Sequence, residues 1–434
     1  MANINVDFSK AVGKIKPMHA VGQPPMLGIN SSLFKYLTDI AVPYSRLHDV
    51  GGVYASYKWV DVPNIFRDFD ADENDPASYD FAFTDLLITE LVKANIEPFF
   101  RLGVTIENYA TVKAYRIYPP KDFGKWARIC EHIIRHYTEG WADGFNYKIT
   151  YWEIWNEPDN GPTHEENQMW WGTKEEFFEL YDIASKHLKK CFPHLKIGGF
   201  ASCGFYALSG NWIPEAKISP RREYFLQFFI EFLEYIKKSG APLDFFSWHT
   251  YDSVESNVHY ARYAREMLDK YGFTETETSC NEWLPAVKQR GTYHQAAEIA
   301  AVMLAYQNLP VDTAMIYDAR CGVSDYSPLF NPETKKPYPA YYSLAAFGRL
   351  YKLGTQVALD CDNENVYAVA ATDGKIGCVM MSNHKEEAVP LTLSVNENAK
   401  EIICLITGDG RLDTATALPN ELPANSVLSV MYNL

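Results

Sequence analysis

The sequence is short of the features that mark several classes of protein. Its 8 cysteines in 434 residues include no Cys-x-x-Cys pair, and the histidines form no cluster with the spacing of a zinc module. A disulfide scaffold and a zinc module are therefore excluded, and cysteines such as Cys130 and Cys203 are expected to be reduced thiols in the core. No apolar run reaches 18 residues, which excludes a membrane-spanning helix.

Positive charge is also scarce, because 40 Lys and Arg stand against 55 Asp and Glu, for a net charge of -15. This balance argues against nucleic acid and anionic membranes as partners, and it disfavours polyanionic substrates such as glycosaminoglycans. The N-terminus lacks a basic start followed by an apolar run. We therefore expect a cytoplasmic protein, or a secreted one if a leader has been removed.

Short apolar segments alternate with longer segments that carry apolar residues at helical spacing, which predicts an α/β protein built on a (β/α)8 TIM barrel. The chain is too long for one ordinary core and suits a barrel with a smaller module. We predict eight barrel strands, over residues 26–30, 44–49, 97–103, 149–157, 196–200, 244–252, 276–284 and 312–319.

The sequence pattern changes at about residue 355. From there, short segments of alternating polarity and turn signals such as Asp373-Gly374 predict a C-terminal β-sandwich domain. We therefore expect a barrel over 26–354 and a sandwich over 355–434. The N-terminal segment 1–25 is a candidate for further strands of the sandwich. We favour a packing role for the sandwich over a role in binding carbohydrate.

Residues 151–158, which read Tyr-Trp-Glu-Ile-Trp-Asn-Glu-Pro, are the most informative stretch of the chain. The proline that follows Glu157 cannot donate to a ladder and favours an extended glutamate, so we expect the strand to stop there. In a TIM barrel the functional groups stand at the carboxyl ends of the strands. A carboxylic acid beside the amide of Asn156 is the layout of a glycosidase general acid, and Trp152 and Trp155 offer flat faces on which sugars stack.

A retaining glycosidase needs a second carboxylate, and Glu282 at the end of the seventh predicted strand is the candidate. Glu157 is predicted as the acid/base, and Glu282 as the nucleophile that attacks the anomeric carbon, with roughly 5 to 5.5 Å between the two carboxyl groups. The charge of Glu282 is expected to raise the pKa of Glu157. Glu275 and Glu277 are rival nucleophiles, but they lie at the start of the strand, at the far end of the barrel.

Other residues at the predicted strand ends are candidates for binding the sugar. The amide of Asn156 suits the 2-hydroxyl of the sugar, histidines suit equatorial hydroxyls, and Tyr251 can hydrogen-bond Glu282 and keep it ionised. Glu153 is interpreted as structural, with a partner such as Arg101. The predicted substrate-binding residues are Asn156, His48, His249, Tyr251, Arg46, Trp155, Trp283 and Asp318.

These residues resemble glycoside hydrolase family 39, which belongs to the clan A retaining glycosidases. The resemblance is carried by Arg46-Leu47-His48, Tyr79-Asp80-Phe81, residues 94–100, 119–122 and 152–158, His249-Thr250-Tyr251 and Asn281-Glu282-Trp283. It implies a retaining mechanism with Glu157 as acid/base and Glu282 as nucleophile. It also implies β-xylosidase or α-L-iduronidase activity without a metal or another cofactor.

Within this resemblance we expect a retaining exo-glycoside hydrolase, β-xylosidase-like, that removes terminal neutral pentosyl residues from an oligosaccharide or another glycoside. The alternatives left open are an α-L-arabinopyranosidase, an α-L-iduronidase-like or endo-acting enzyme, and a non-catalytic glycan-binding barrel. Family β-xylosidases carry a tryptophan at the end of strand eight, whereas this chain reads Tyr317-Asp318-Ala319-Arg320. Arg320 is the candidate cation for a uronate substrate. A homo-oligomer is compatible with the sequence.

Overall fold

Eight parallel strands form a closed barrel, in the order in which they follow one another along the chain. The computed structural model describes residues 1–50, 60–106, 116–396, 400–408, 411–415 and 418–434. The barrel strands are β2 (Ala20–Gly22), β3 (Tyr44–Leu47), β4 (Glu97–Leu102), β5 (Tyr151–Ile154), β6 (Lys196–Ser202), β7 (Phe245–Thr250), β8 (Glu277–Trp283) and β9 (Thr313–Ile316). The predicted (β/α)8 barrel is therefore confirmed.

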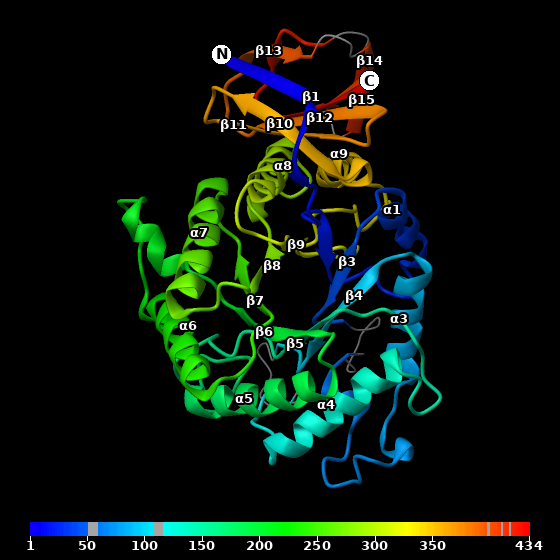
Figure 1. Ribbon diagram of the computed structural model, residues 1–434, viewed down its shortest axis with the longest axis vertical. Coiled ribbons are helices and arrows are strands. Elements are labelled where there is room, and N and C mark those ends of the chain that lie inside the picture. The colour runs from blue at the N-terminus through cyan, green and yellow to red at the C-terminus, as the bar shows by residue number, and fades with distance from the viewer. Residues whose placement is uncertain (51–59, 107–115, 397–399, 409–410, 416–417) are drawn as a thin grey trace.

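Helices surround the barrel, as Figure 1 shows. They are α1 (Phe34–Asp39), α2 (Val62–Ile65), α3 (Ala82–Lys93), α4 (Phe123–Thr138), α5 (Lys174–Cys191), α6 (Pro220–Ser239), α7 (Val254–Tyr271), α8 (Tyr293–Gln307) and α9 (Pro339–Leu353). Short 3-10 helices add η1 (Ser31–Leu33), η2 (Pro76–Ser78), η3 (Tyr206–Asn211) and η4 (Val287–Gln289). None of the helices in the described ranges is long and apolar enough to cross a membrane.

Local sequence signals set several helix ends. Helix α5 begins with a capping box in which Thr173 and Glu176 satisfy each other's backbone N–H groups. Helices α6 and α7 end at Gly240 and Gly272, which adopt the left-handed conformation that glycine takes without steric cost. These signals explain why the alternation of strands and helices could be predicted from the sequence.

The first predicted strand is wrong. The barrel strand is β2 (Ala20–Gly22), which pairs with β3 and β9, whereas residues 26–30 form a turn in which Asn30 N–H donates to the carbonyl of Met26 at 3.0 Å. Three residues are too few to show a periodicity of two, and the apolar residues of 26–30 are only partly buried or, like Ile29, exposed. The other seven predicted segments each contain an observed strand.

The remaining nine strands form one sheet, in the order β15-β14-β17-β12-β11-β10-β1-β13-β16. They are β1 (Ala2–Lys14), β10 (Thr355–Cys361), β11 (Val366–Thr372), β12 (Ile376–Asn383), β13 (Val389–Val395), β14 (Lys400–Gly408), β15 (Arg411–Ala415), β16 (Glu421–Leu422) and β17 (Ser426–Asn433). Strand β1 runs antiparallel to β10 and parallel to β13, and both chain termini lie in this domain (Figure 1).

The sheet folds over itself around a core of its own, which gives the two layers of a sandwich. Phe8 of β1 lies 5.7 Å from the ring of Tyr432 on β17, although three strands separate β1 from β17 within the sheet. The same phenyl ring covers Gly377 of β12, where a Cβ atom would approach it to 2.5 Å. Glycine at position 377 is therefore required by the close approach of the two layers.

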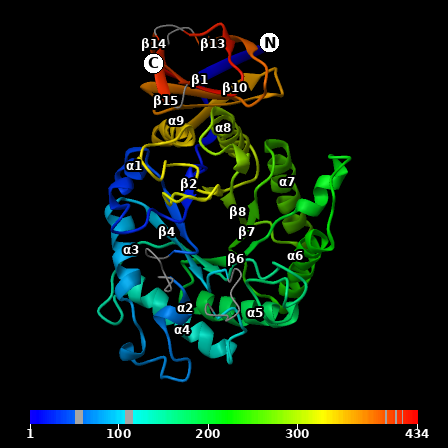
Figure 2. The same cartoon turned by 180° about the vertical axis from the view of Figure 1, so that it is seen from behind.

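The sandwich rests on α8 and α9, as both views of the molecule show (Figures 1 and 2). The lower face of its sheet, with Val369 and Met380, belongs to the same hydrophobic core as the barrel and these two helices. Ser382 donates a hydrogen bond to the carbonyl of Ala297 on α8 at 2.7 Å. Most residues of helix α8 are buried because the barrel covers one face and the sandwich the other.

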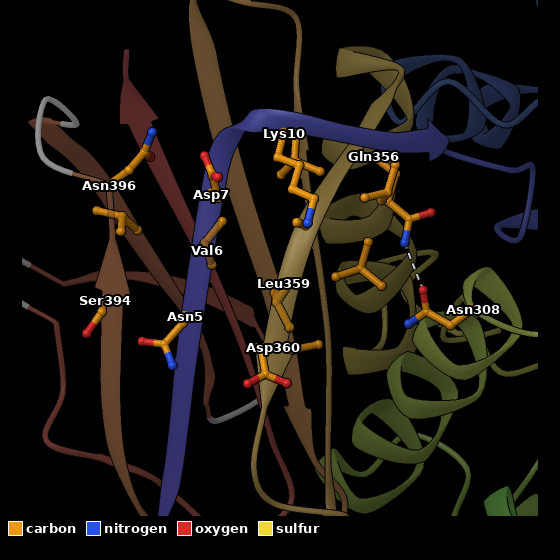
Figure 3. Close-up of a pocket in the computed structure, with 16 residues that line it drawn as sticks. Asn5, Val6, Asp7, Lys10, Asn308, Gln356, Leu359, Asp360, Ser394 and Asn396 are labelled. Atoms are coloured by element: carbon orange, nitrogen blue, oxygen red, sulfur yellow. Dashed lines mark hydrogen bonds between the residues drawn. The ribbon is translucent and has the colours of Figure 1, made fainter.

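A cavity of about 700 Å³ opens on the sandwich where β1 crosses towards the barrel (Figure 3). Gln356 of β10 spans its edge and donates a hydrogen bond to Asn308, just after α8, at 2.8 Å. None of the lining residues within the described part of the chain is aromatic, so this cavity lacks the stacking faces on which sugar rings bind. It includes none of the residues predicted for the site.

Candidate active site

The backbone turns sharply where β5 delivers Glu157 to the barrel mouth. The strand ends at Ile154, and both Trp155 and Glu157 have positive φ angles, 68° and 44°. The expected extended conformation of Glu157 is therefore wrong. Each such residue costs about 1 to 3 kcal/mol, and hydrogen bonds from Trp155 N–H to Leu102 O (2.7 Å) and from Glu157 N–H to Ala201 O (3.0 Å) hold the turn.

Glu157 and Glu282 face each other across the mouth of the barrel, with His249 between them. One side-chain donor atom from each of the three residues lies within 4.8 Å of the other two. His249 Nδ1 lies 2.6 Å from Glu157 Oε1 and 3.4 Å from Glu282 Oε2. A single imidazole nitrogen therefore bridges both carboxylates.

Glu282 is held by two donors in addition to this histidine. Tyr251 donates its hydroxyl proton to Oε2 at 2.7 Å, and Arg46 Nη1 approaches Oε1 at 3.1 Å. The residue is only 5% exposed, so both of its oxygens are fixed in position. Partners of this kind hold a carboxylate in one orientation, which a nucleophile requires.

Arg46 organises the floor of the site from inside the barrel. Its Nε donates to Glu153 Oε2 at 2.7 Å, and its Nη2 donates to Asn156 Oδ1 at 2.5 Å. Because a guanidinium can only donate, the amide oxygen of Asn156 must face it. Within the described part of the chain, the amide nitrogen is buried and has no hydrogen-bond partner. Asn156 therefore presents a donor, as binding of a sugar hydroxyl requires.

Glu153 is the buried hub of this network, and Arg46, not Arg101, is its ionic partner. Its Oε1 also accepts hydrogen bonds from Ser247 at 2.6 Å and from Asn281 at 2.5 Å. Arg101 pairs instead with Asp61 at 2.6 Å. Both oxygens of this buried carboxylate therefore have hydrogen-bond partners.

The pKa values of the three central groups follow from burial and from their mutual charges. Burial acts to lower the pKa of His249, but the charges of Glu282 and Glu157 outweigh it and raise that pKa above its ordinary value. Burial raises the pKa of Glu282 over the opposing effects of His249 and Arg46. The expected rise in the pKa of Glu157 is wrong. Burial acts to raise this pKa, but the hydrogen bond from His249 outweighs burial and lowers it.

Asn160 is a contact that the sequence analysis missed. Its Nδ2 donates to Glu157 Oε2 at 2.8 Å, and Arg221 at the start of α6 holds its side-chain oxygen at 2.9 Å. The signal was present, because Asn160 stands three residues after Glu157 in a turn, and Asn160 N–H donates back to the carbonyl of Glu157 at 3.0 Å. Both oxygens of Glu157 are thereby engaged.

The predicted aromatic residues do not meet the carboxylates. Trp155 is 1% exposed, donates its indole N–H to Met169 O at 2.9 Å and packs between β5 and α4. Trp283 is fully buried and its ring packs against Tyr306 of α8. Trp152 likewise stacks on Phe100 in the core. The period of two along a strand already places Trp283 on the opposite face from Glu282.

Asp318 is also turned away from the sugar site. It is fully buried, and its carboxylate accepts hydrogen bonds from Ser327 at 2.9 Å and from Arg320 Nε at 2.8 Å. This arrangement ties the loop after β9 together. His48 lies buried at the end of β3 with its Nε2 3.2 Å from Asp49. The contacts of Asp318 are therefore structural, whereas the role of His48 in binding the sugar stays a prediction.

The rival nucleophile Glu277 lies at the opposite end of β8 from Glu282, as predicted. It accepts a hydrogen bond from Tyr151 at 2.8 Å and pairs with Lys196, both of them at the starts of their strands. Glu157, His249 and Glu282 also have the donor types of a divalent-cation site, but Arg46 already places a positive charge against Glu282 there.

A closed (β/α)8 barrel with two opposed glutamates at the carboxyl ends of β5 and β8 defines a glycoside hydrolase of the TIM-barrel type. The model of the glycosyl hydrolases family 39 matches residues 37–330. The chain belongs to this family, as the sequence resemblance indicated, and it is a glycoside hydrolase.

Similar proteins support the same family. A β-xylosidase from Caldicellulosiruptor saccharolyticus is 24% identical over 441 residues, covering 93% of this chain and 80% of that protein. The crystal structure of a glucosidase from Croceicoccus marinus has a TM-score of 0.76 at 21% identity and covers 100% of this chain and 99% of its own. A GH39 β-xylosidase from Caulobacter crescentus has a TM-score of 0.71 at 18% identity, with both chains fully covered. These two structures share the fold.

Proposed function

We propose that the protein is a retaining, β-xylosidase-like exo-glycosidase that removes a terminal neutral pentosyl residue by double displacement. Glu157 protonates the leaving oxygen while Glu282 attacks the anomeric carbon and forms a glycosyl-enzyme ester. Glu157 then takes a proton from water, which displaces Glu282. The observation that carries this proposal is the approach of the two carboxylates to within 4.8 Å.

This separation supports retention of configuration. Retaining enzymes hold their two carboxyl groups about 5 to 5.5 Å apart, whereas inverting enzymes leave about 6.5 to 9.5 Å for a water molecule. His249 and Tyr251 both approach Oε2 of Glu282, at 3.4 and 2.7 Å, and hold this carboxylate in position facing Glu157. Direct attack by Glu282 is therefore the favoured route.

The proton that Glu157 donates is held jointly with His249. A hydrogen bond of 2.6 Å joins them, so the pair carries one proton that lies on nitrogen or on oxygen. The charge of Glu282 helps to keep this proton on the pair. As Glu282 forms its bond to the sugar and loses that charge, the pair releases the proton through Glu157 to the leaving oxygen.

The charges around the site favour a neutral sugar. Arg46 is bound by Glu153, Glu282 and Asn156. Arg320, the cation considered for a uronate carboxylate, is held by Asp318 at 2.7 Å. The similar protein from Caldicellulosiruptor saccharolyticus is described as a β-xylosidase. A neutral pentoside such as a β-D-xyloside is therefore the proposed substrate.

The test is release of nitrophenol from aryl glycosides (β-D-xyloside, α-L-arabinopyranoside, β-D-glucoside, β-D-galactoside and α-L-iduronide). We expect turnover of the β-D-xyloside, loss of it in Glu282→Ala, and a fall of about 10²- to 10⁴-fold in Glu157→Ala on substrates with poor leaving groups. Azide should restore activity to Glu157→Ala and give a glycosyl azide of retained configuration.

Glu277→Gln is the matched control, because Glu277 lies on the same strand at the far end of the barrel. It should keep the wild-type rate. Inversion at the anomeric carbon by NMR, or an active Glu282→Ala enzyme, would refute the assigned roles. A folded protein that is inactive across the panel but binds xylo-oligosaccharides would favour the glycan-binding barrel instead.

A further inference from the structure

Helices α4 and α5 lie side by side on the outer ring of the barrel (Figures 1 and 2). His187 and Cys191 stand four residues apart on α5 and so share one face of that helix. Glu131 of α4 faces them from the neighbouring helix. The packing of two helices thus gathers a carboxylate, an imidazole and a thiol, away from the carboxylates at the barrel mouth.

The donor atoms of these three side chains converge on one point. Glu131 Oε2 lies 2.6 Å from His187 Nε2, and Cys191 Sγ lies 3.8 Å from the same nitrogen. All three donor atoms lie within 4.8 Å of one another. Around a tetrahedral zinc ion with bonds of about 2.0 to 2.3 Å, donor atoms stand about 3.3 to 3.7 Å apart. A small rotation of Glu131 would open the group to that size.

The geometry does not suit a nucleophilic thiol. In a Cys-His-acid triad the thiol and the acid use the two different nitrogens of the imidazole. Here both face the same nitrogen, Nε2 of His187. Donors that converge in this way are arranged as ligands of a shared cation.

We propose that Glu131, His187 and Cys191 form a binding site for a divalent transition-metal ion of the zinc type, which clips α4 to α5. The donor set of thiolate, imidazole and carboxylate is one that Zn²⁺ prefers. His187 is 30% exposed at its side chain and Glu131 15%, so the site opens to solvent and water can supply the fourth ligand.

The site has both a positive and a negative neighbour, because Arg135 pairs with Oε1 of Glu131 at 2.8 Å and the carboxyl end of α5 lies at Cys191. Cys191 is the last residue of α5, where the unpaired carbonyls give the helix end a partial negative charge. Arg135 engages Oε1 of Glu131, so the metal would take Oε2 and replace its hydrogen bond to His187 Nε2.

The experiment uses the full-length protein, freed of metal with a chelator and then titrated with Zn²⁺ and with Co²⁺. We expect one equivalent to bind, and Co²⁺ to produce the charge-transfer absorption of a thiolate ligand. Cys191→Ser should abolish this band, and Glu131→Gln and His187→Gln should weaken binding by more than about tenfold. Circular dichroism checks that each metal-free variant is folded.

Cys361→Ser is the control, because Cys361 is a partly buried thiol in the sandwich domain. It should leave binding and the cobalt band unchanged. Failure of the wild-type protein to bind one equivalent, or a cobalt band that persists in Cys191→Ser, would overturn the proposal. Glycosidase activity is measured separately. Metal-free Glu131→Gln should hydrolyse aryl glycosides at the wild-type rate. The metal site and the proposed glycosidase function can therefore be refuted independently of each other.

Discussion

At the scale of single residues, neighbours decide what two similar glutamates do. Glu282 is fixed by Tyr251 and Arg46, whereas Glu157 shares its proton with His249. His249 touches both carboxylates, so it couples their charges. We infer that the protonation of the site is a property of this group of three residues and not of either glutamate alone.

The dependence of kcat/KM on pH should be bell-shaped. Glu282 must be ionised, and its pKa is raised above 4.5, so activity should fall at acid pH sooner than an ordinary glutamate would allow. The proton shared by His249 and Glu157 must be present, and the pKa of His249 is raised above 6.5, so the alkaline limb should lie above that value. Rates on an aryl glycoside across pH 4 to 10 give both limbs.

Replacing His249 by Gln should narrow this profile from both sides. Glu282 loses a positive neighbour, which moves the acid limb upwards, and the proton then rests on Glu157 alone, which moves the alkaline limb downwards. His259→Gln is the control, because His259 stacks on Trp212 at the surface. An unchanged alkaline limb in His249→Gln would show that the histidine does not share the proton.

At the scale of elements, a buried ion pair ties the end of β4 to the start of α2. Asp61 accepts hydrogen bonds from Arg101 Nη2 at 2.6 Å and from Thr105 N–H at 2.9 Å, and both charged side chains are almost fully buried. This contact joins two segments that support the mouth of the barrel. It is invisible in the sequence, because the partners lie forty residues apart in separate elements.

Removing one partner of this pair should be costly. Asp61→Ala leaves the Arg101 guanidinium uncompensated in the interior, and we expect the free energy of unfolding to fall by about 3 to 5 kcal/mol. Urea denaturation measures it. Asp70→Ala, which breaks the exposed pair with Lys121, is the control and should change stability by less than about 1 kcal/mol. Equal effects would mean that burial of the first pair does not matter.

Element prediction succeeded where the local pattern was long and failed where it was short. Segments such as 97–103 and 276–284 lie between longer segments with helical spacing, and each holds a strand. Strand β2 has three residues and follows no visible pattern, so its pairing with β3 and β9 depends on closure of the barrel. Strand ends were also overestimated, because Trp155 leaves the extended conformation before Glu157.

At the scale of the whole molecule, barrel and sandwich share one continuous hydrophobic core through α8 and α9. Met380 and Met381 are neighbours on β12 that face opposite ways. Met380 belongs to the core shared with the barrel, and Met381 to the core inside the sandwich. Strand β12 therefore separates the two cores and contributes side chains to both.

Because of this shared core, the molecule should unfold in a single transition. Met380→Ala and Met381→Ala should each lower the free energy of unfolding by about 2 to 5 kcal/mol, and each should move the same calorimetric peak. Calorimetry with activity measured alongside checks this. Two peaks, of which only the first responds to Met381→Ala, would mean that the sandwich unfolds on its own.

The sequence by itself determined the barrel, the change to a pattern of short β-strands near residue 355, and the two glutamates. Periodicity and strand-end position are local properties of the chain. It also pointed to Arg46, Asn156, His249 and Tyr251, which the fold gathers around those glutamates.

Only the tertiary structure decided which way the other predicted residues face. Trp155, Trp283 and Asp318 stand close in sequence to the site, yet they pack into the core or bind their own loop. Asn160 was not among the predicted residues, yet it holds Glu157, and Glu153 binds Arg46 and not the expected Arg101. The direction of a side chain at a strand end depends on the backbone turn there and on the elements that pack against it, and neither is encoded in a local pattern.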